Sequence, residues 1–231
     1  KVILFVIIVL FIILYLRKKK DHFEVTIKKT LVTYVYFENE RSKKNLKFFI
    51  KNGIYNKNDV VYNIIIKGGT CSITLPKFKN INVYKTKNEG YDFAGYSKSI
   101  NNVNINDFKY FIFLNDTNIG PFVPRFVNKN NWYIMFTSLL SDKIKLVGST
   151  MNKQSYKVNN KIVSKHVQSM CFATDIIGLN LLIKNKVFNK KYNIDVCKNK
   201  TKFEFIVNFE INIIKIIIEN GYKITSFNQT E

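Results

Sequence analysis

The sequence predicts an α/β fold in which a mostly parallel, doubly wound sheet is flanked by helices. Strand-like segments alternate with amphipathic segments through the first half of the chain, and this alternation is typical of parallel sheets. The strand expected at residues 110–114 is almost wholly apolar, as in a strand that helices cover on both faces. With 231 residues, 46% of them hydrophobic, the chain is long enough for one domain with a sizeable core.

The first half of the chain is expected to alternate between strands and helices. Residues 30–37 are β-branched and aromatic, which indicates a strand. Residues 41–52 carry Leu46, Phe49 and Ile50 ahead of Gly53, which indicates a helix that ends at the glycine. The other elements expected here are strands at 60–66, 81–84 and 110–114 and a helix at 93–100.

The second half continues with a helix at 132–140 and strands at 144–148 and 167–174. Asp175 can cap the next helix, because its side chain can accept a hydrogen bond from the first helical turn. The apolar stripe of that helix consists of Ile176, Leu179, Leu182 and Ile183. A last helix at 203–220 should end at Gly221, and residues 222–227 can form a final strand.

The N-terminal residues 2–16 form an uninterrupted apolar run, and the basic residues 17–20 follow it. As a helix the run spans roughly 22 Å, short of the ~30 Å hydrocarbon core, and snorkelling of Lys1 and Arg17 can cover the gap. We expect one uncleaved transmembrane helix, because no small-residue cleavage site follows; a signal peptide is the alternative. The expected domains are an anchor with its basic flank (1–20), a linker (21–29) and one globular domain (30–231).

Charge bears on the placement and partners of this domain. The basic residues after the apolar run favour a single-pass protein with a cytosolic domain, and a lumenal, Golgi-type placement stays open. The net charge of +21 is spread through a chain rich in Lys, Asn and Ile, so no nucleic-acid partner is expected. A basic surface nevertheless favours anionic ligands and anionic membranes.

Cysteine and histidine are too sparse for a disulfide framework or a zinc site. The chain has three cysteines, Cys71, Cys171 and Cys197, with no CxxC pair, and its histidines are His22 and His166. Cys171 lies in an apolar run and is expected in the core.

Two short signatures localise the expected ligand site. Residues 88–96 (NEGYDFAGY) form a glycine-bearing loop that enters a helix, and residues 111–121 (FIFLNDTNIGP) form an apolar strand that ends at Asn115 and Asp116. Open α/β sheets bind ligands at the carboxyl ends of their strands. A carboxylate there can hold a divalent cation against the phosphates of a nucleotide sugar, and a glycine loop lets backbone N–H groups approach them.

Structural roles are the alternative for these residues. Asn115 and Asp116 can form an ordinary turn at a strand end, and Asp92 can cap the helix that follows it. The patterns GxGxxG and GxxxxGK[ST] are both absent, which argues against most nicotinamide and nucleoside-triphosphate sites.

The two signatures resemble the rhamnan synthesis protein F type of glycosyltransferase and its relatives in plants, algae and large viruses. Further motifs agree in order, and the resemblance covers roughly residues 31–227. These motifs are residues 142–150 (DKIKLVGST), 166–170 (HVQSM) and 173–178 (ATDIIG), and then Phe209 and Glu210 with Gly221 and Tyr222.

The resemblance implies a GT-A-like, Rossmann-type glycosyltransferase domain that uses a nucleotide-sugar donor. In such folds a DxD motif holds Mn²⁺ or Mg²⁺, and here Asn115-Asp116-Thr117 offers one carboxylate, so Asp116 is the expected ligand of a divalent cation. The resemblance makes Glu210 the candidate catalytic base and His166 a candidate contact to the diphosphate or acceptor. The candidate donor-binding residues are Asn88, Gly90, Asp92, Asn115, Asp116, Gln168 and Ser169.

The leading hypothesis is a membrane-anchored glycosyltransferase that moves rhamnose or another hexose to a glycan or a lipid-linked acceptor. The alternative is a catalytically inactive domain of the same fold, which acts as a membrane-tethered glycan-binding or scaffold protein. The incomplete DxD motif is the reason for keeping this alternative.

Overall fold

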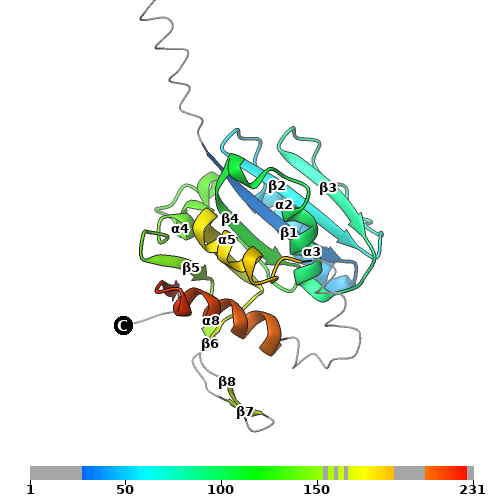
Figure 1. The fold of residues 1–231 in the computed structure, drawn as a ribbon. Helices are drawn as coiled ribbons and strands as arrows, with labels where there is room; N and C mark the ends of the chain where they lie inside the picture. Colours follow the sequence, from blue (N-terminus) through cyan, green and yellow to red (C-terminus); the bar gives the residue numbers. More distant parts are fainter. Residues whose placement is uncertain (1–27, 153–155, 159–160, 164–165, 190–205, 228–231) are drawn as a thin grey trace, which may run out of the picture.

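A seven-stranded sheet lies at the centre of the computed structural model, which describes residues 28–152, 156–158, 161–163, 166–189 and 206–227 (Figure 1). The strands lie in the order β11 (Lys223–Ser226), β5 (Ile144–Gly148), β10 (Cys171–Asp175), β4 (Phe108–Asn115), β1 (Lys29–Phe37), β2 (Val60–Lys67) and β3 (Ile81–Thr86). Strand β10 runs antiparallel to both of its neighbours, and every other pair is parallel. The predicted mostly parallel α/β sheet is therefore confirmed.

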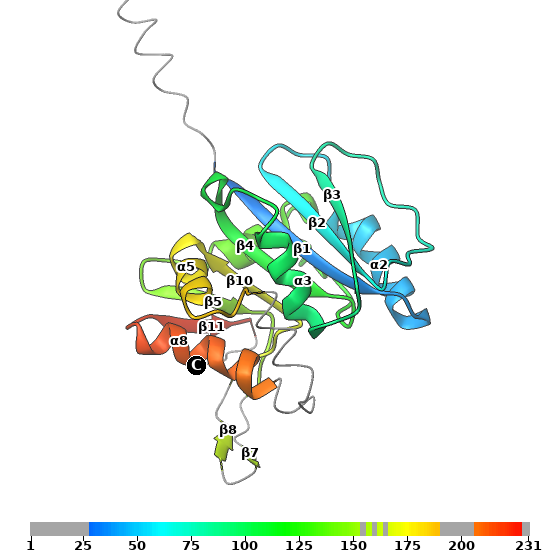
Figure 2. The same ribbon diagram turned by 45° about the vertical axis from the view of Figure 1, so that its right-hand side comes forward.

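Helices cover both faces of the sheet. Helices α3 (Tyr91–Ile100), α5 (Ile176–Lys184) and α8 (Asn212–Glu219) pack on the face seen in Figure 2. Helices α2 (Glu40–Gly53) and α4 (Ile134–Thr137) pack on the opposite face. Strand β1 serves both cores, because Leu31 and Val35 face one set of helices while Val32 and Tyr34 face the other.

Two predicted elements differ in extent from the structure. The helix expected at 132–140 is the single turn α4, which follows the 3₁₀ turn η2 (Lys129–Asn131). The strand expected at 167–174 is divided by a turn at Ser169 and Met170. Its first residues form β9 (His166–Val167), which pairs with β6 (Met151–Asn152), and its last residues form β10.

The remaining elements lie outside the seven-stranded sheet. A hairpin of β7 (Tyr156–Val158) and β8 (Lys161–Val163) was not predicted, and neither was the 3₁₀ turn η1 (Ile105–Asp107) before β4. The last helix begins, within the described residues, as the π-helical segment η3 (Ile206–Ile211) and continues as α8. Single π-helical turns occur often at functional sites.

Local chemistry explains how the two helices nearest the sheet's carboxyl edge begin. Asn39 caps α2 by accepting a hydrogen bond from the Ser42 backbone N–H. Helix α3 starts from Gly90 and Tyr91, whose left-handed φ values of 65° and 44° turn the chain sharply into the helix. Farther along α3, a Cβ on Gly95 would lie 2.7 Å from Val35 Cγ2, so only glycine lets α3 approach β1 this closely.

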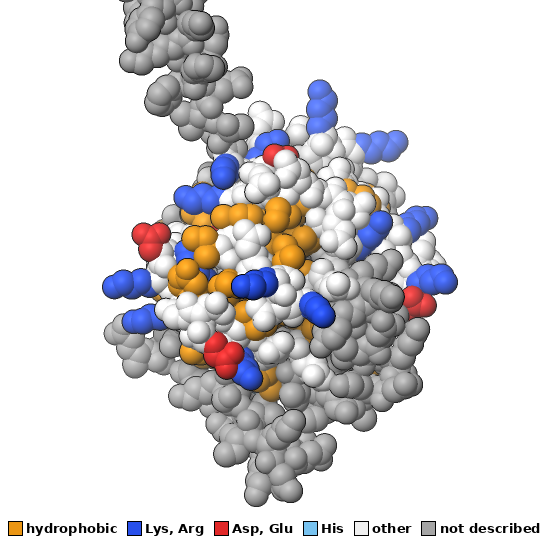
Figure 3. Space-filling view, viewed as in Figure 1, with side chains coloured by type: hydrophobic (Ala, Val, Ile, Leu, Met, Phe, Trp, Pro, Cys, Tyr) orange, Lys and Arg blue, Asp and Glu red, His pale blue; other side chains and the backbone are white. Residues whose placement is uncertain are grey.

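The charged surface and the predicted membrane anchor remain to be compared with the structure. Lys and Arg side chains are scattered over the face shown in Figure 3 rather than gathered into one block. Among the described residues, no helix has the length and apolar character needed to cross a bilayer. The apolar run at 2–16, where we expect the membrane anchor, and Cys197 lie outside the described residues, whereas Cys171 is buried as predicted.

Candidate active site

The candidate site lies where β1 and β4 end side by side. The connection from β1 through α2 leads to β2 on one side, whereas the connection from β3 through α3 returns to β4 on the other side. Such a topological switch point opens a crevice at the carboxyl ends of the strands, and α/β sheets bind their ligands there. Both signatures of the sequence, with Asp92 and Asp116, reach this edge of the sheet.

Asp116 joins the two strand ends. Its Oδ2 accepts a hydrogen bond of 2.6 Å from the Phe37 backbone N–H, and its own N–H donates to the Val35 carbonyl at 3.0 Å. Helix α2 adds a bond of 2.8 Å from Asn45 Nδ2 to the Asp116 carbonyl. The residue is 9% exposed, so its carboxylate takes part in holding the sheet edge together.

The charges around Asp116 are positive. Burial raises the pKa of Asp116, while the Phe37 N–H, Ser42 and the charges of Lys67 and Arg41 act in the opposite direction. Arg41 is held close by, because its Nη2 donates to the Thr117 carbonyl at 2.9 Å. Asp116 is thus a buried, hydrogen-bonded carboxylate beside two basic side chains.

These surroundings do not fit the expected divalent cation. Such cations are held by several oxygen ligands, usually with more than one carboxylate. Asp116 Oδ2 is already bonded to Phe37, and within the described ranges no group of three or more His, Cys, Asp and Glu residues could hold a metal ion. The cation itself stays a prediction from the family resemblance.

Asn115 turns the other way, towards α3. Its Nδ2 donates to Asp92 Oδ2 at 2.7 Å, and its Oδ1 accepts from both the backbone N–H and the hydroxyl of Thr117, at 3.1 and 2.6 Å. Asp92 lies in the first turn of α3 and does not cap it, because Gly90 occupies the N-cap position. The structure therefore brings Asp92 and Asn115 together, as the two-signature hypothesis requires.

A third carboxylate, that of Glu210, comes to the same edge from η3. The hydroxyl of Ser169 donates to Glu210 Oε1 at 2.6 Å, and His166 Nε2 lies 4.0 Å from Glu210 Oε2. The side chains of His166 and Glu210 are only 7% and 16% exposed. Tyr96 fixes the turn that carries Ser169, because its hydroxyl donates to the Ser169 carbonyl at 3.1 Å.

Glu210 and Asp92 lie close enough to influence each other's charge. Burial raises the pKa of Glu210, and the Asp92 carboxylate raises it further, whereas Ser169 and His166 lower it. A carboxyl group whose pKa is raised above its usual value is a stronger base when ionised and is better suited to accepting a proton. The site thus gathers Asp92, Asn115, His166, Ser169 and Glu210 from four separate stretches of the sequence.

Three expected donor contacts lie around this cluster. Gln168 is half-buried and accepts a hydrogen bond of 2.7 Å from the Thr150 hydroxyl. Asn88 is exposed in the loop ahead of α3, and Gly90 forms the left-handed turn at the start of that helix. None of these placements tests a contact with a donor.

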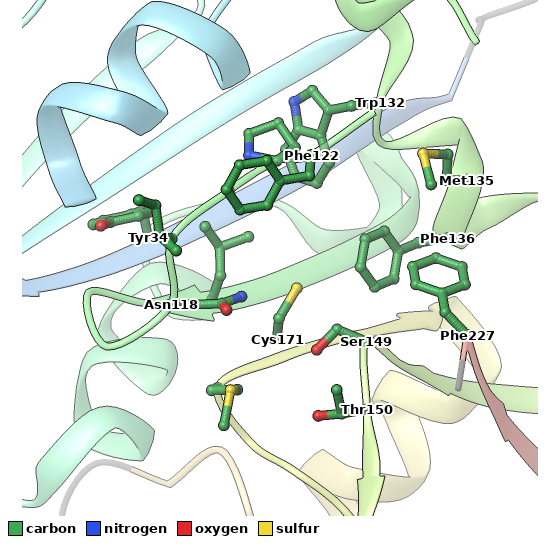
Figure 4. A pocket seen from close by; sticks show the side chains of 15 residues that line it. Tyr34, Asn118, Phe122, Trp132, Met135, Phe136, Ser149, Thr150, Cys171 and Phe227 are labelled. Carbon is green, nitrogen blue, oxygen red and sulfur yellow. The ribbon is translucent and has the colours of Figure 1, made fainter. Parts of the chain in front are cut away.

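A cavity of about 230 Å³ lies next to the end of β4, and none of the five residues of the cluster is in its lining (Figure 4). The loop at 118–122 and α4 form much of its wall, and most of its lining is apolar. Its polar side includes Asn118, Ser149 and Thr150, the last of which also bonds Gln168. The cavity therefore adjoins one candidate donor contact, Gln168.

Sequence analysis missed Arg41, Lys67 and Tyr96 as neighbours of the site. Lys67 alone gave a usable signal, because it is a charged residue at the end of a mostly apolar strand, VVYNIIIK. The position of Tyr96 on the helix did not reveal that its hydroxyl reaches Ser169.

Comparison with protein families gives a match. The family model described as "Rhamnan synthesis protein F" matches residues 75–231, which is more than half of the chain and includes every candidate site residue named above from Asn88 onward. No curated protein matches the chain.

Proposed function

The chain belongs to the rhamnan synthesis protein F family, and from this membership we propose that it moves rhamnose or another hexose from a nucleoside-diphosphate donor to a glycan or lipid-linked acceptor. The family implies glycosyltransferase activity in general. The observation that carries the proposal is the meeting of Asp92, Asn115, Ser169 and Glu210 at the carboxyl edge of the sheet. This edge is where the fold class binds its ligands.

Glu210 is the proposed general base of an inverting transfer. Its carboxylate takes the proton of the acceptor hydroxyl while the oxygen of that hydroxyl attacks the anomeric carbon of the donor. The bond between the anomeric carbon and the diphosphate oxygen breaks, and the nucleoside diphosphate leaves with the electron pair. Ser169 and His166 favour the ionised form of Glu210, which this step requires.

The donor lies, in this proposal, between Glu210 and the loop after β4. Asp92 is held by Asn115 and can accept hydrogen bonds from sugar hydroxyls. Asn88, Gly90 and Gln168 are the proposed outer donor contacts. The proposed N-terminal anchor would keep this domain at a membrane, where a lipid-linked acceptor is found; the side of the membrane stays open.

A panel of nucleotide sugars tests the proposal. The purified full chain in detergent micelles is incubated with each donor, with and without Mn²⁺, and release of nucleoside diphosphate is measured. We expect release from at least one donor, faster when a glycan acceptor is added. The glycosyltransferase proposal fails if no donor is turned over and no nucleoside diphosphate binds.

A non-catalytic scaffold is the second candidate. The observation in its favour is that Asp116 is engaged in hydrogen bonds within the fold. A scaffold would bind glycans equally well before and after Glu210→Gln and would release no nucleoside diphosphate. The donor panel, run on both proteins, separates the two functions.

A further inference from the structure

Two basic side chains lie at the sheet edge where the donor's phosphates would be placed. Arg41 stands in the first turn of α2, and Lys67 is the last residue of β2. The register of the sheet sets Lys67 directly beside Phe37, the residue whose N–H binds the Asp116 carboxylate. Both basic groups therefore adjoin the ends of β1 and β4 at the topological switch point.

Each of these side chains is held in position. Lys67 is only 4% exposed, and its Nζ donates to the Tyr91 carbonyl at the start of α3. Arg41 is exposed, and its guanidinium bonds the Thr117 carbonyl in the loop after β4. A buried ammonium is costly to maintain unless hydrogen bonds or charges compensate it, and Asp116 supplies a compensating charge here.

We propose that Arg41 and Lys67 bind the diphosphate of the donor and carry the charge-neutralising role that a divalent cation has at a DxD motif. This inference rests on the proposed function. Guanidinium and ammonium groups are the usual protein partners of phosphate, and guanidinium can bind two phosphate oxygens at once. They would also stabilise the negative charge that develops on the leaving diphosphate.

The surroundings of Asp116 favour this assignment over a bound cation. A divalent cation placed at Asp116 would meet two positive side chains and a carboxylate oxygen already bonded to Phe37. An anionic diphosphate at the same place would instead be attracted by both side chains. Asp116 then has a structural role, because its carboxylate accepts the Phe37 N–H at the end of β1.

Calorimetric binding of UDP, GDP and dTDP to the full chain tests the inference, once in EDTA and once in Mn²⁺. We expect at least one of these nucleotides to bind with the same dissociation constant in both buffers. Arg41→Gln and Lys67→Met should each weaken binding by about tenfold or more, because each removes a charged hydrogen-bond donor. The control Lys51→Gln, about 15 Å farther along α2, should leave binding unchanged.

Asp116→Asn distinguishes a role for Asp116 as a cation ligand from a role as a hydrogen-bond acceptor within the fold. It removes a negative charge but keeps an oxygen that can accept the Phe37 N–H, so nucleotide binding in EDTA should be kept or become tighter. The inference is overturned if binding requires Mn²⁺, if Asp116→Asn abolishes binding, or if Arg41→Gln or Lys67→Met binds as the wild type does. If no nucleotide binds in either buffer, the proposed function itself falls.

Discussion

The hydroxyl of Ser169 should set the pH range in which the enzyme works. It donates to Glu210 Oε1 at 2.6 Å and so stabilises the ionised carboxylate within a largely buried site. Ser169→Ala removes this hydrogen-bond donor. Because Ser169 lowers the pKa of Glu210 in the wild type, its loss should raise that pKa further above the usual value.

The sign of the effect follows from the role of Glu210 as a base. A base is active when ionised, so the rate rises with pH as Glu210 loses its proton. Ser169→Ala should shift this rise to higher pH. A hydrogen bond to a charged group contributes roughly 1.5–3 kcal/mol, which corresponds to a loss of about 10- to 100-fold in kcat on the acidic side and recovery on the alkaline side.

The assay measures kcat as a function of pH for the wild type, Ser169→Ala and Ser169→Thr, with one nucleotide-sugar donor. The threonine variant keeps a hydroxyl and should restore much of the wild-type profile. A drop in Ser169→Ala that is equal at every pH, with a raised KM, would refute the reasoning. Ser169 would then act as a donor contact and not through Glu210.

Three further variants test the proposed base and the stability of the fold. Glu210→Gln should reduce kcat by about 10²- to 10⁴-fold. Because the pKa of Glu210 is raised in the folded protein, ionisation of this residue destabilises the fold as pH rises through that pKa. The variant should therefore unfold at a higher urea concentration than the wild type at alkaline pH, but not at acidic pH. Asp116→Ala should lower the free energy of unfolding by about 1–3 kcal/mol because the Phe37 N–H loses its acceptor, and Asp116→Asn should cost less; equal losses in urea titrations would contradict this. Gly95→Ala should cost roughly 1–3 kcal/mol through the clash with Val35, and Val35→Ala in the same chain should relieve part of it; strictly additive losses would argue against the clash.

The sheet could be predicted from the sequence because its strands are local features. The apolar runs that became β1, β2 and β4 are rich in β-branched and aromatic residues, and each is followed by a polar or glycine-bearing loop. The single strand expected at 167–174 is wrong because Ser169 turns towards Glu210 and ends the run, a contact between residues far apart in sequence.

The sequence predicted which residues lie at the sheet edge but not the directions of their side chains. The end of an apolar strand correctly located Asn115 and Asp116 at the sheet edge, yet nothing local indicates that one side chain faces α3 and the other β1. Lys67 was missed for a similar reason, since its proximity to Asp116 depends on the pairing of β1 with β2.

The most direct test of the account compares wild type with Glu210→Gln on the nucleotide sugar that the donor panel identifies. Both proteins should bind the nucleoside diphosphate with similar affinity, and only the wild type should transfer the sugar at an appreciable rate. Equal transfer by the two proteins would contradict the assignment of Glu210 as the base. Absence of transfer by the wild type with every donor would contradict the glycosyltransferase function.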